Sequence, residues 1–245
     1  MAVLSVVSLG TGSAEYLTRG GEAAMRNAKQ LVLRTGRSPI ASFLTEQGCD
    51  FDTLDDLYEQ CEDFDAFHQA AAVTLFSRMK EGDLCYVVSD AAFDGTVFAL
   101  QRLKPRDLEL RIVPGVSLAD CCLSLIKRQS GHVRIMSACE LEESKLLPDE
   151  PLLLCELYSR ECAGDCKLKL MELLPDELPV TLITGREEDG ILQAEEIPLM
   201  ELDRQEKYDH LMAVYIPPVP MEQRTRYDMD DLVRIMARLR SPEGC

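Results

Sequence analysis

The chain has 245 residues, enough for one large domain or two small α/β domains, and 46% of its residues are hydrophobic, as in ordinary globular proteins. Its formal net charge is -17, from 26 basic and 43 acidic residues. Such a surface repels nucleic-acid phosphates and anionic lipids, which argues against nucleic-acid and membrane partners.

The sequence shows neither a membrane-spanning run nor the features of a signal peptide. No apolar run reaches the roughly 20 residues of a membrane-spanning helix, and MAVLSVVSLG lacks the basic segment of a signal peptide. We therefore expect a cytoplasmic protein whose 10 cysteines stay reduced. These cysteines form no Cys-x-x-Cys pair and only three histidines accompany them, so we predict buried free thiols and no metal.

The first half of the chain alternates strand-like and helix-like segments, which is typical of an α/β protein with a mostly parallel sheet. The expected strands are Val3–Leu9, Leu31–Arg34, Asp83–Val88 and Leu108–Val113. The expected helices are one with Pro39 in its first turn, the acidic Asp55–Cys61, the amphipathic Phe64–Met79, and Asp94–Leu103. We interpret the acidic run between residues 55 and 65 as solvated surface.

The second half repeats this alternation. Ser117 is the expected N-cap of a helix that ends at Ile126. The later elements are expected to be strands Pro151–Glu156, Pro179–Thr184 and Leu211–Ile216, helix Ala163–Leu174, a stiff proline-rich linker over 217–220, and an amphipathic helix Met229–Leu239. The predicted domains are therefore residues 1–115, 116–220 and 221–245.

A glycine turn directly after the first strand raises the question of a ligand. Gly10-Thr11-Gly12 lacks the third glycine of a dinucleotide fingerprint, and the chain has no Gly-Lys-Ser/Thr of a phosphate loop. A nucleotide phosphate is therefore disfavoured. Close approach of the backbone to another ligand and a tight strand-to-helix turn both remain explanations of the glycines.

Three stretches of sequence together resemble one protein family. The opening VVSLGTGSAEYLTRGGEAAMRNA, the later GDLCYVVSDAAFDGTVFAL and the element RIVPGVSLADCCL resemble three conserved elements of the tetrapyrrole (corrin/porphyrin) methylases, at the family's spacing. The resemblance continues from PLLLCELYSRECAGDCKLKL to HLMAVYIPPV. It implies a class III methyltransferase-like fold: two α/β domains with a cofactor cleft between them, followed here by a C-terminal helix.

The same resemblance implies S-adenosylmethionine as the cofactor and a small molecule as methyl acceptor. No conspicuous catalytic residue is required, because positioning and desolvation carry much of a methyl transfer. Matching the motifs residue by residue gives the expected cofactor contacts: Gly10, Thr11, Gly12, Ser89, Asp90, Ala91, Phe93, Asp94, Pro114, Gly115, Val116, Ser117, Leu118, Leu157, Tyr158, His210, Leu211 and Met212.

The chain departs from the family pattern in two places. Ser8 stands where the family has its first glycine, and Asp90-Ala91-Ala92 replaces Gly-Asp-Pro. Asp90 or Asp94 can accept a hydrogen bond from the cofactor's ribose or amino group, whereas Asp94 can equally cap the following helix. His210 either contacts the adenine or is a partly buried histidine with a partner in the protein.

The tail YDMDDLVRIMARLRSPEGC resembles the beginning of a MazG-type nucleotide pyrophosphohydrolase, a domain that follows a methylase-like domain in some bacterial proteins. This resemblance implies a MazG-like domain in the full-length protein, and the methylase resemblance implies a homodimer. Two functions follow. The first is an S-adenosylmethionine-dependent methyltransferase; the second is a catalytically degenerate scaffold or regulatory module for a downstream MazG-type hydrolase.

Overall fold

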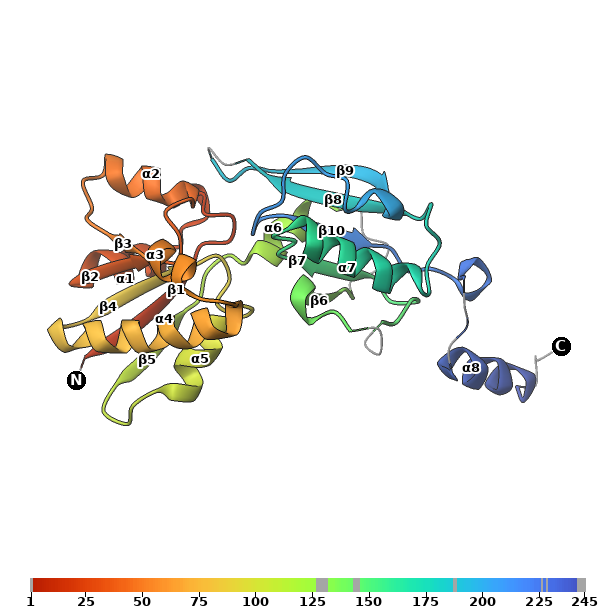
Figure 1. The fold of residues 1–245 in the computed structure, drawn as a ribbon, viewed down its shortest axis with the longest axis horizontal. Coiled ribbons are helices and arrows are strands. Elements are labelled where there is room, and N and C mark those ends of the chain that lie inside the picture. Colours follow the sequence, from red (N-terminus) through yellow and green to blue (C-terminus); the bar gives the residue numbers. More distant parts are fainter. Residues whose placement is uncertain are drawn as a thin grey trace. The chain divides into compact units, whose positions relative to one another are not determined.

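The structure is a computed structural model that describes residues 2–126, 132–142, 146–186, 189–225, 227 and 229–241. The chain forms two compact units (Figure 1). The first comprises Met1–Leu125 with Gly185–Gln193, and the second comprises Ile126–Thr184 with Ala194–Cys245. Domain boundaries at residues 115 and 220 stay a prediction. Among the described helices, none has the length and apolar character needed to span a membrane.

A five-stranded parallel sheet forms the centre of the first unit, with strand order β3-β2-β4-β1-β5. The strands are β1 (Val3–Ser8), β2 (Gln30–Leu33), β3 (Asp52–Thr53), β4 (Leu84–Val88) and β5 (Glu109–Val113). Strand β1 pairs in parallel with both β4 and β5, so the carboxyl ends of these three strands meet at one edge. The predicted parallel sheet is confirmed for this unit, although the two-residue β3 was not predicted.

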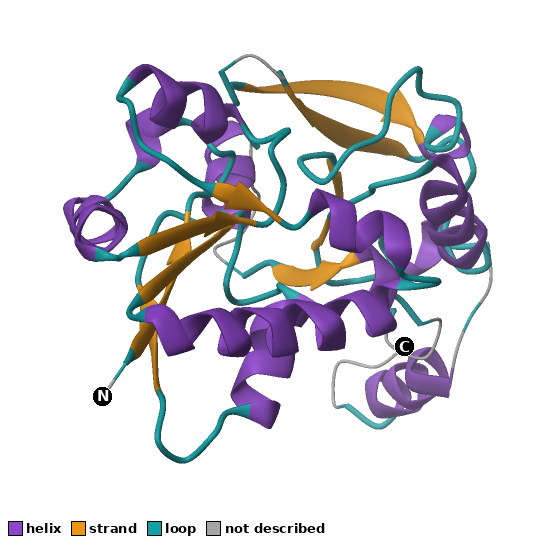
Figure 2. Ribbon diagram, turned by 60° about the vertical axis from the view of Figure 1, so that its left-hand side comes forward, coloured by secondary structure: helices purple, strands orange, loops and turns teal. Residues whose placement is uncertain are grey.

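Helices cover both faces of this sheet (Figure 2). Met25 and Ile40 belong to the core on one face, whereas Phe67, Leu75 and Val97 belong to the core on the other. The helices of the unit are α1 (Arg19–Asn27), α2 (Pro39–Glu46), α3 (Asp55–Gln60), α4 (Phe64–Arg78), α5 (Gly95–Leu103) and α6 (Leu118–Leu125). The prediction that Pro39 occupies a first helical turn is confirmed, since its missing N–H leaves no unpaired donor there.

The second unit also has a five-stranded sheet, with strand order β6-β7-β10-β8-β9. The strands are β6 (Arg134–Ser137), β7 (Leu152–Cys155), β8 (Pro179–Gly185), β9 (Leu192–Pro198) and β10 (Ala213–Ile216). Strands β6 and β7 are parallel, but β10 runs antiparallel to both β7 and β8. The expectation of a mostly parallel sheet is therefore wrong here, because alternation of segments does not reveal strands that join without a crossover helix.

Three details of the second unit differ from expectation. Helix α7 (Arg160–Met171) begins at Arg160 rather than Ala163, because the Ser159 hydroxyl caps the Cys162 amide at 3.1 Å while the first turn is too polar to show an apolar pattern. Strands β6 and β9 were not predicted, since β9 is mostly exposed and reads LQAEEIP. Residues 217–220, predicted to be a stiff linker, pack against the second unit, because Val219 is buried and its amide donates to Pro148 O at 2.6 Å.

Helix α7 contains a glycine that its surroundings do not require. A Cβ added at Gly164 meets only the Asp203 side chain, at 3.9 Å, which is an ordinary van der Waals contact. We expect Gly164→Ala to raise the free energy of unfolding by about 0.5–1 kcal/mol, because alanine loses less backbone entropy in a helix. Urea denaturation measures this gain, and a loss of stability would contradict the packing at α7.

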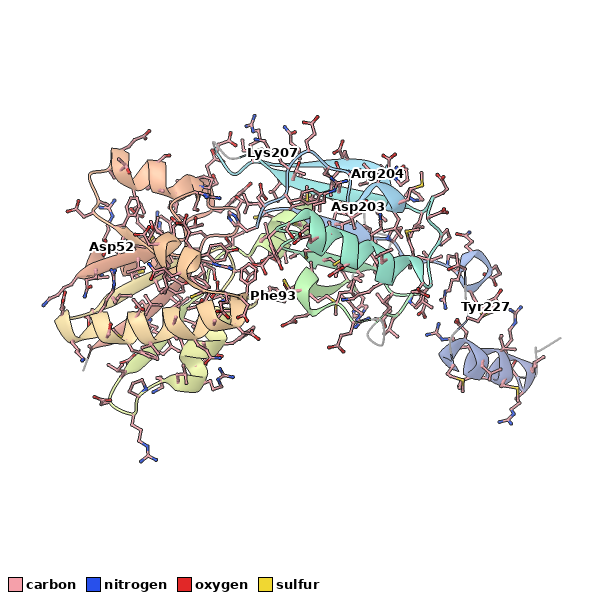
Figure 3. The ribbon with its side chains drawn as sticks, in the orientation of Figure 1. Asp52, Phe93, Asp203, Arg204, Lys207 and Tyr227 are labelled. Carbon is pink, nitrogen blue, oxygen red and sulfur yellow. The ribbon has the colours of Figure 1, made fainter. Side chains whose placement is uncertain are left out.

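Helix α8 spans Met229–Leu239, with the bounds that the apolar spacing predicts. A buried ion pair between Arg224 and Asp231 fixes its first turn, and Arg234 contacts Asp149 at 2.6 Å. The opposite side of α8 carries exposed apolar side chains, namely Met229, Leu232, Val233, Met236 and Leu239. Tyr227, just before the helix, is also exposed (Figure 3).

Candidate functional site

The loop after β1 turns sharply at its two glycines. Gly10 and Gly12 have φ angles of 61° and 84°, in the left-handed region where side chains cause strain. The Gly10 amide donates to Ser89 O at 2.8 Å, and this bond holds the turn beside the end of β4. The turn therefore lies where the sequence places it, next to the second predicted loop.

The loop after β4 is closed by hydrogen bonds that Asp90 accepts from amides of the same loop. Asp90 O accepts from the amides of Phe93 and Asp94, at 3.2 and 3.0 Å, and Asp90 Oδ1 accepts from Ala92 N at 3.0 Å. Ser89 and the Phe93 side chain (Figure 3) are half-buried, whereas Asp90, Ala91 and Asp94 are buried. Side-chain turns of this kind replace the rigidity that the family's proline supplies, so the altered sequence still forms an ordered loop.

Ser8 links this second loop to the first strand. Its hydroxyl accepts a hydrogen bond from the Ala91 amide at 3.0 Å, and the serine is buried. The sequence comparison treats Ser8 only as a lost glycine and misses this role. Its position as the last residue of a strand beside a parallel strand end could have indicated this role.

The loop after β5 supplies the third predicted segment. Ser117 Oγ accepts from the Asp120 amide at 3.0 Å and donates to Asp120 Oδ2 at 2.8 Å, so the predicted N-cap of α6 is confirmed. Thr18 Oγ1 donates to Pro114 O at 3.3 Å and ties the loop to α1. Pro114 is exposed, Gly115, Val116 and Ser117 are half-buried, and Leu118 is buried.

The glycines of these loops let the backbone pack on itself. A Cβ on Gly115 would lie 2.3 Å from Ser8 O, and a Cβ on Gly12 would lie 2.5 Å from Ser38 Oγ. A Cβ on Gly190, at the β8–β9 connection, would lie 2.7 Å from Thr11 O. The small residues are therefore required for loop-to-loop contact, and Gly190, which sequence reasoning missed, covers one side of the first turn.

Three buried side-chain oxygens of these loops lack hydrogen-bond partners among the described residues, namely Thr11 Oγ1, Asp90 Oδ2 and Asp94 Oδ2, and the last of them is ion-paired with Arg34. Thr11 has no exposed surface, and Asp90 is 8% exposed. Burial raises the pKa of Asp90 above its ordinary 3.8; the Ala92 amide opposes this shift, while the nearby Asp120 carboxylate adds to it. Unsatisfied polar atoms are costly, which sets Thr11 Oγ1 and Asp90 Oδ2 apart from the satisfied polar groups around them.

Behind the second loop lies a polar cluster in which Asp94 and Thr96 are buried and Arg34 and His68 are half-buried. Asp94 Oδ1 accepts from the Val97 amide at 3.0 Å and caps α5, and Asp94 Oδ2 lies 3.0 Å from Arg34 Nη1. His68 Nδ1 lies 3.0 Å from Thr96 Oγ1. Of the two roles considered for Asp94, the helix cap is confirmed. Sequence reasoning missed Arg34, although its place directly after β2 could have indicated that it lies at the carboxyl edge of the sheet.

In the second unit, the chain turns tightly after β7. Glu156 has a φ of 65°, a conformation that is uncommon outside glycine and often marks functional sites. Ser137 Oγ donates to Glu156 Oε2 at 3.3 Å, and the Tyr158 amide donates to Glu156 O at 2.9 Å. Tyr158, a predicted contact, is half-buried beside this turn.

The remaining predicted residues of the second unit lie together. The Leu157 amide donates to Met212 O at 2.9 Å, and the Leu211 amide donates to Asp209 Oδ1 at 2.8 Å. Leu157 and Met212 are core residues, whereas His210 is half-buried. Only backbone groups of the two core residues are therefore suited to contact a ligand.

The other chemistry at hand is limited. In the described ranges, no group of three or more histidine, cysteine, aspartate or glutamate residues is arranged to hold a metal ion. The nine described cysteines are free thiols, of which Cys49 and Cys139 are exposed. The arrangement suits ligand binding by polar groups and backbone at the strand ends.

Comparisons with known proteins agree with this architecture. Among solved structures, the chain is similar to the cobalamin biosynthesis precorrin-6Y methylase of Archaeoglobus fulgidus (TM-score 0.61, 13% identity, covering 89% of this chain and 98% of that one). It is also similar to a diphthine synthase (TM-score 0.61, 16% identity, 88% and 90% covered) and to the uroporphyrin-III-C-methyltransferase of Thermus thermophilus (TM-score 0.60, 16% identity, 89% and 95% covered). At these identities the likeness establishes the fold, which is class III methyltransferase-like.

A curated relative and a family model define the relationship further. The uncharacterized protein YabN of Bacillus subtilis (strain 168) is 29% identical over 246 residues, which cover 99% of this chain and 50% of the relative. The chain thus spans about half the length of that protein. The model of the tetrapyrrole (corrin/porphyrin) methylases matches residues 3–184. The chain belongs to the tetrapyrrole methylase family.

Proposed function

We propose that this chain binds S-adenosylmethionine at the carboxyl ends of β4, β1 and β5 and acts as a methyltransferase on a small-molecule acceptor. The observation that carries the proposal is the pair of buried, unpartnered oxygens, Thr11 Oγ1 and Asp90 Oδ2. They lie on two of the three loops that family motifs assign to the cofactor. The family consists of S-adenosylmethionine-dependent methyltransferases, which supports this cofactor as the ligand at the strand ends.

The residues present fit the polar parts of such a nucleoside. When bound, S-adenosylmethionine supplies its methyl group from a sulfonium cation. The Thr11 hydroxyl either donates or accepts a hydrogen bond, and the Asp90 carboxylate accepts from a hydroxyl or amino group. Asp90, if charged, also favours a cation near it. Because the three loops are packed against each other through Ser8 and Gly115, these groups are held in place before any ligand arrives.

Titration calorimetry with S-adenosylmethionine and S-adenosylhomocysteine tests the proposal. We expect saturable binding that weakens at least about tenfold in Thr11→Val and in Asp90→Asn, the cost of one lost hydrogen bond. Asp107→Asn, a change at an exposed aspartate away from the three loops, serves as the matched control. No binding at millimolar ligand would overturn the function, whereas binding unaffected by either variant would overturn the site.

Asp90 also gives a stability prediction with a defined sign. A carboxyl whose pKa is raised on folding costs stability above its folded pKa, and the cost is relieved as the pH falls toward the ordinary value of 3.8. We expect Asp90→Asn to raise the melting temperature at pH 7 and to lose this advantage below pH 3.8. Thermal melts over this range, with Asp107→Asn as control, measure it; an advantage independent of pH would contradict the burial of a charged Asp90.

A second function is favoured by two observations. Asp90-Ala91-Ala92 replaces the Gly-Asp-Pro of the family, and Gly190 lies against Thr11. Under this alternative the fold is a scaffold or regulatory module for a downstream MazG-type hydrolase of the full-length protein. It predicts no cofactor binding and a changed pyrophosphohydrolase rate when residues 1–220 are deleted, and an unchanged rate would count against it.

The assembly we propose is a homodimer. The exposed apolar side of α8 supports this proposal, because such a surface is commonly buried by association. Light scattering measures the mass in solution. A monomer at micromolar concentration would contradict the dimer without affecting the cofactor site.

A further inference from the structure

The side chain of His68 lies over the start of helix α5. His68 belongs to α4, which packs against α5. A Cβ added at Gly95, the first residue of α5, would lie 2.4 Å from His68 Cδ2 and 2.5 Å from His68 Nε2, so the imidazole ring rests directly on this backbone. The ring also contacts Phe64 and Phe67, with centroid separations of 6.0 and 5.4 Å. His68 is thus held against the first turn of α5.

The first turn of α5 is continuous with the loop that carries Asp90. Thr96 Oγ1, in this turn, lies 3.0 Å from His68 Nδ1, and Thr96 has no exposed surface. Asp94 is the N-cap of α5, and its amide donates to Asp90 O at 3.0 Å. A displacement of the His68 ring would therefore disturb the start of α5, and with it the hydrogen bond that closes the loop on Asp90.

The surroundings of His68 disfavour a charged imidazolium. Burial, the largest cause, lowers the pKa of His68 below its ordinary 6.5; Asp94 and Asp65 oppose this shift, and Arg34 adds to it. The positive end of the α5 dipole lies beside the ring and acts in the same direction as Arg34. Tyr86, on β4 in the same cluster, is fully buried, and burial raises its pKa, so it carries no charge. His68 is therefore neutral in the folded chain at pH 7.

We propose that His68 is a positioning residue for the loop after β4, and that protonation of its ring loosens this loop and weakens cofactor binding. The inference rests on the proposed function, because Asp90 supplies one of the two oxygens assigned to the cofactor. The sign follows from linkage. The stabilising contribution of the packed neutral ring is complete above pH 6.5, and it is lost as the pH falls from there through the pKa of the packed ring.

Proton NMR of the ligand-free chain tests the positioning role. The chain has only three histidines, so the ring signal of His68 is identified by its absence in His68→Gln. We expect this signal to titrate with a midpoint below 6.5. We also expect the protection of the Asp94 amide from hydrogen exchange, corrected for intrinsic exchange, to fall at least about twofold between about pH 7.5 and about pH 5.5, because exchange reports local opening.

Two variants serve as comparisons. In His68→Gln the side-chain amide can still form a hydrogen bond with Thr96 but does not titrate, so we expect its Asp94 protection to be independent of pH over this range. His132→Gln, at an exposed histidine of the second unit, is the matched control and should behave like the natural chain. Circular dichroism establishes that each variant keeps its fold, and the midpoint of His68 is measured in the natural chain.

A His68 midpoint at or above 6.5 would overturn the positioning role. An equal loss of Asp94 protection in the natural chain and in His68→Gln would do the same, because the opening would then have another cause.

Calorimetry with S-adenosylhomocysteine over the same pH range tests the link to the cofactor. We expect the affinity of the natural chain and of His132→Gln to fall toward acid pH at least about twofold more than that of His68→Gln, since Asp90 titrates in all three chains. An equal fall in all three would overturn the effect of His68 on the cofactor. No binding at any pH would instead overturn the proposed function, and the Asp94 protection would still decide the role of His68.

Discussion

Asp94→Ala should lower the free energy of unfolding by about 3 kcal/mol. The change removes the cap of α5, which costs about 1 kcal/mol, and it removes the Asp94 carboxylate from its ion pair with Arg34, where breaking a buried pair costs about 3–5 kcal/mol. The Asp94 side chain is 1% exposed, but that of Arg34 is 21% exposed, so water recovers part of the second cost. Urea denaturation measures the loss, which is a large share of the 5–15 kcal/mol typical of a domain.

Asp94→Asn separates the two contributions. Asparagine is also a good N-cap, so this variant keeps an acceptor for the Val97 amide and loses only the charge beside Arg34. We expect its stability to lie between those of the natural chain and Asp94→Ala. Most surface changes alter the free energy of unfolding by less than about 0.5 kcal/mol. If both variants stay within that range of the natural chain, Asp94 does not have the stabilising contacts described for it behind the second loop.

Gly115→Ala should be nearly as damaging, for a steric reason. Its Cβ would lie 2.3 Å from Ser8 O, and that oxygen is main chain at the end of β1 and does not swing aside as a side chain would. Overpacking of this kind costs about 1–3 kcal/mol. Since Ser8 also holds the second loop through Ala91, we expect the variant to weaken S-adenosylhomocysteine binding as well as stability.

Gly20→Ala is the matched control for this substitution. Gly20 lies in α1, and an added Cβ meets the Val113 side chain at 3.6 Å and Thr18 Oγ1 at 3.9 Å, both ordinary van der Waals contacts. We expect it to leave ligand binding unchanged and to raise the stability by about 0.5–1 kcal/mol. Denaturation and calorimetry on both variants decide the matter, and a tolerated alanine at 115 with unchanged binding would contradict the close packing of the loops.

Much of the fold could be predicted because its elements carry strong local signals. The apolar spacing of α8 and the N-cap at Ser117 placed both helices within a residue of their observed starts. Strand β9 and the first turn of α7 were missed because their side chains are polar and exposed, and so give no periodic pattern. The antiparallel pairing of β10 was beyond prediction, since strand direction depends on connections rather than on the strand's own residues.

The candidate site was predictable in position but not in its working parts. Motifs placed each of the three loops directly after a strand, and the observed parallel pairing brings these strand ends to one edge of the sheet. They did not reveal that Gly12 and Gly115 face the protein's own atoms, because an empty glycine space looks the same in sequence whether backbone or ligand fills it. Nor did they reveal Ser8 and Arg34, whose partners lie far away along the chain.

A crystal structure of the chain with S-adenosylhomocysteine tests the central claim most directly. We predict the nucleoside at the carboxyl ends of β4, β1 and β5, with its polar groups within about 3.2 Å of Thr11 Oγ1 and Asp90 Oδ2, the reach of a hydrogen bond. A ligand bound elsewhere, or a complex in which both oxygens remain without a partner, would contradict the assignment of this edge to the cofactor.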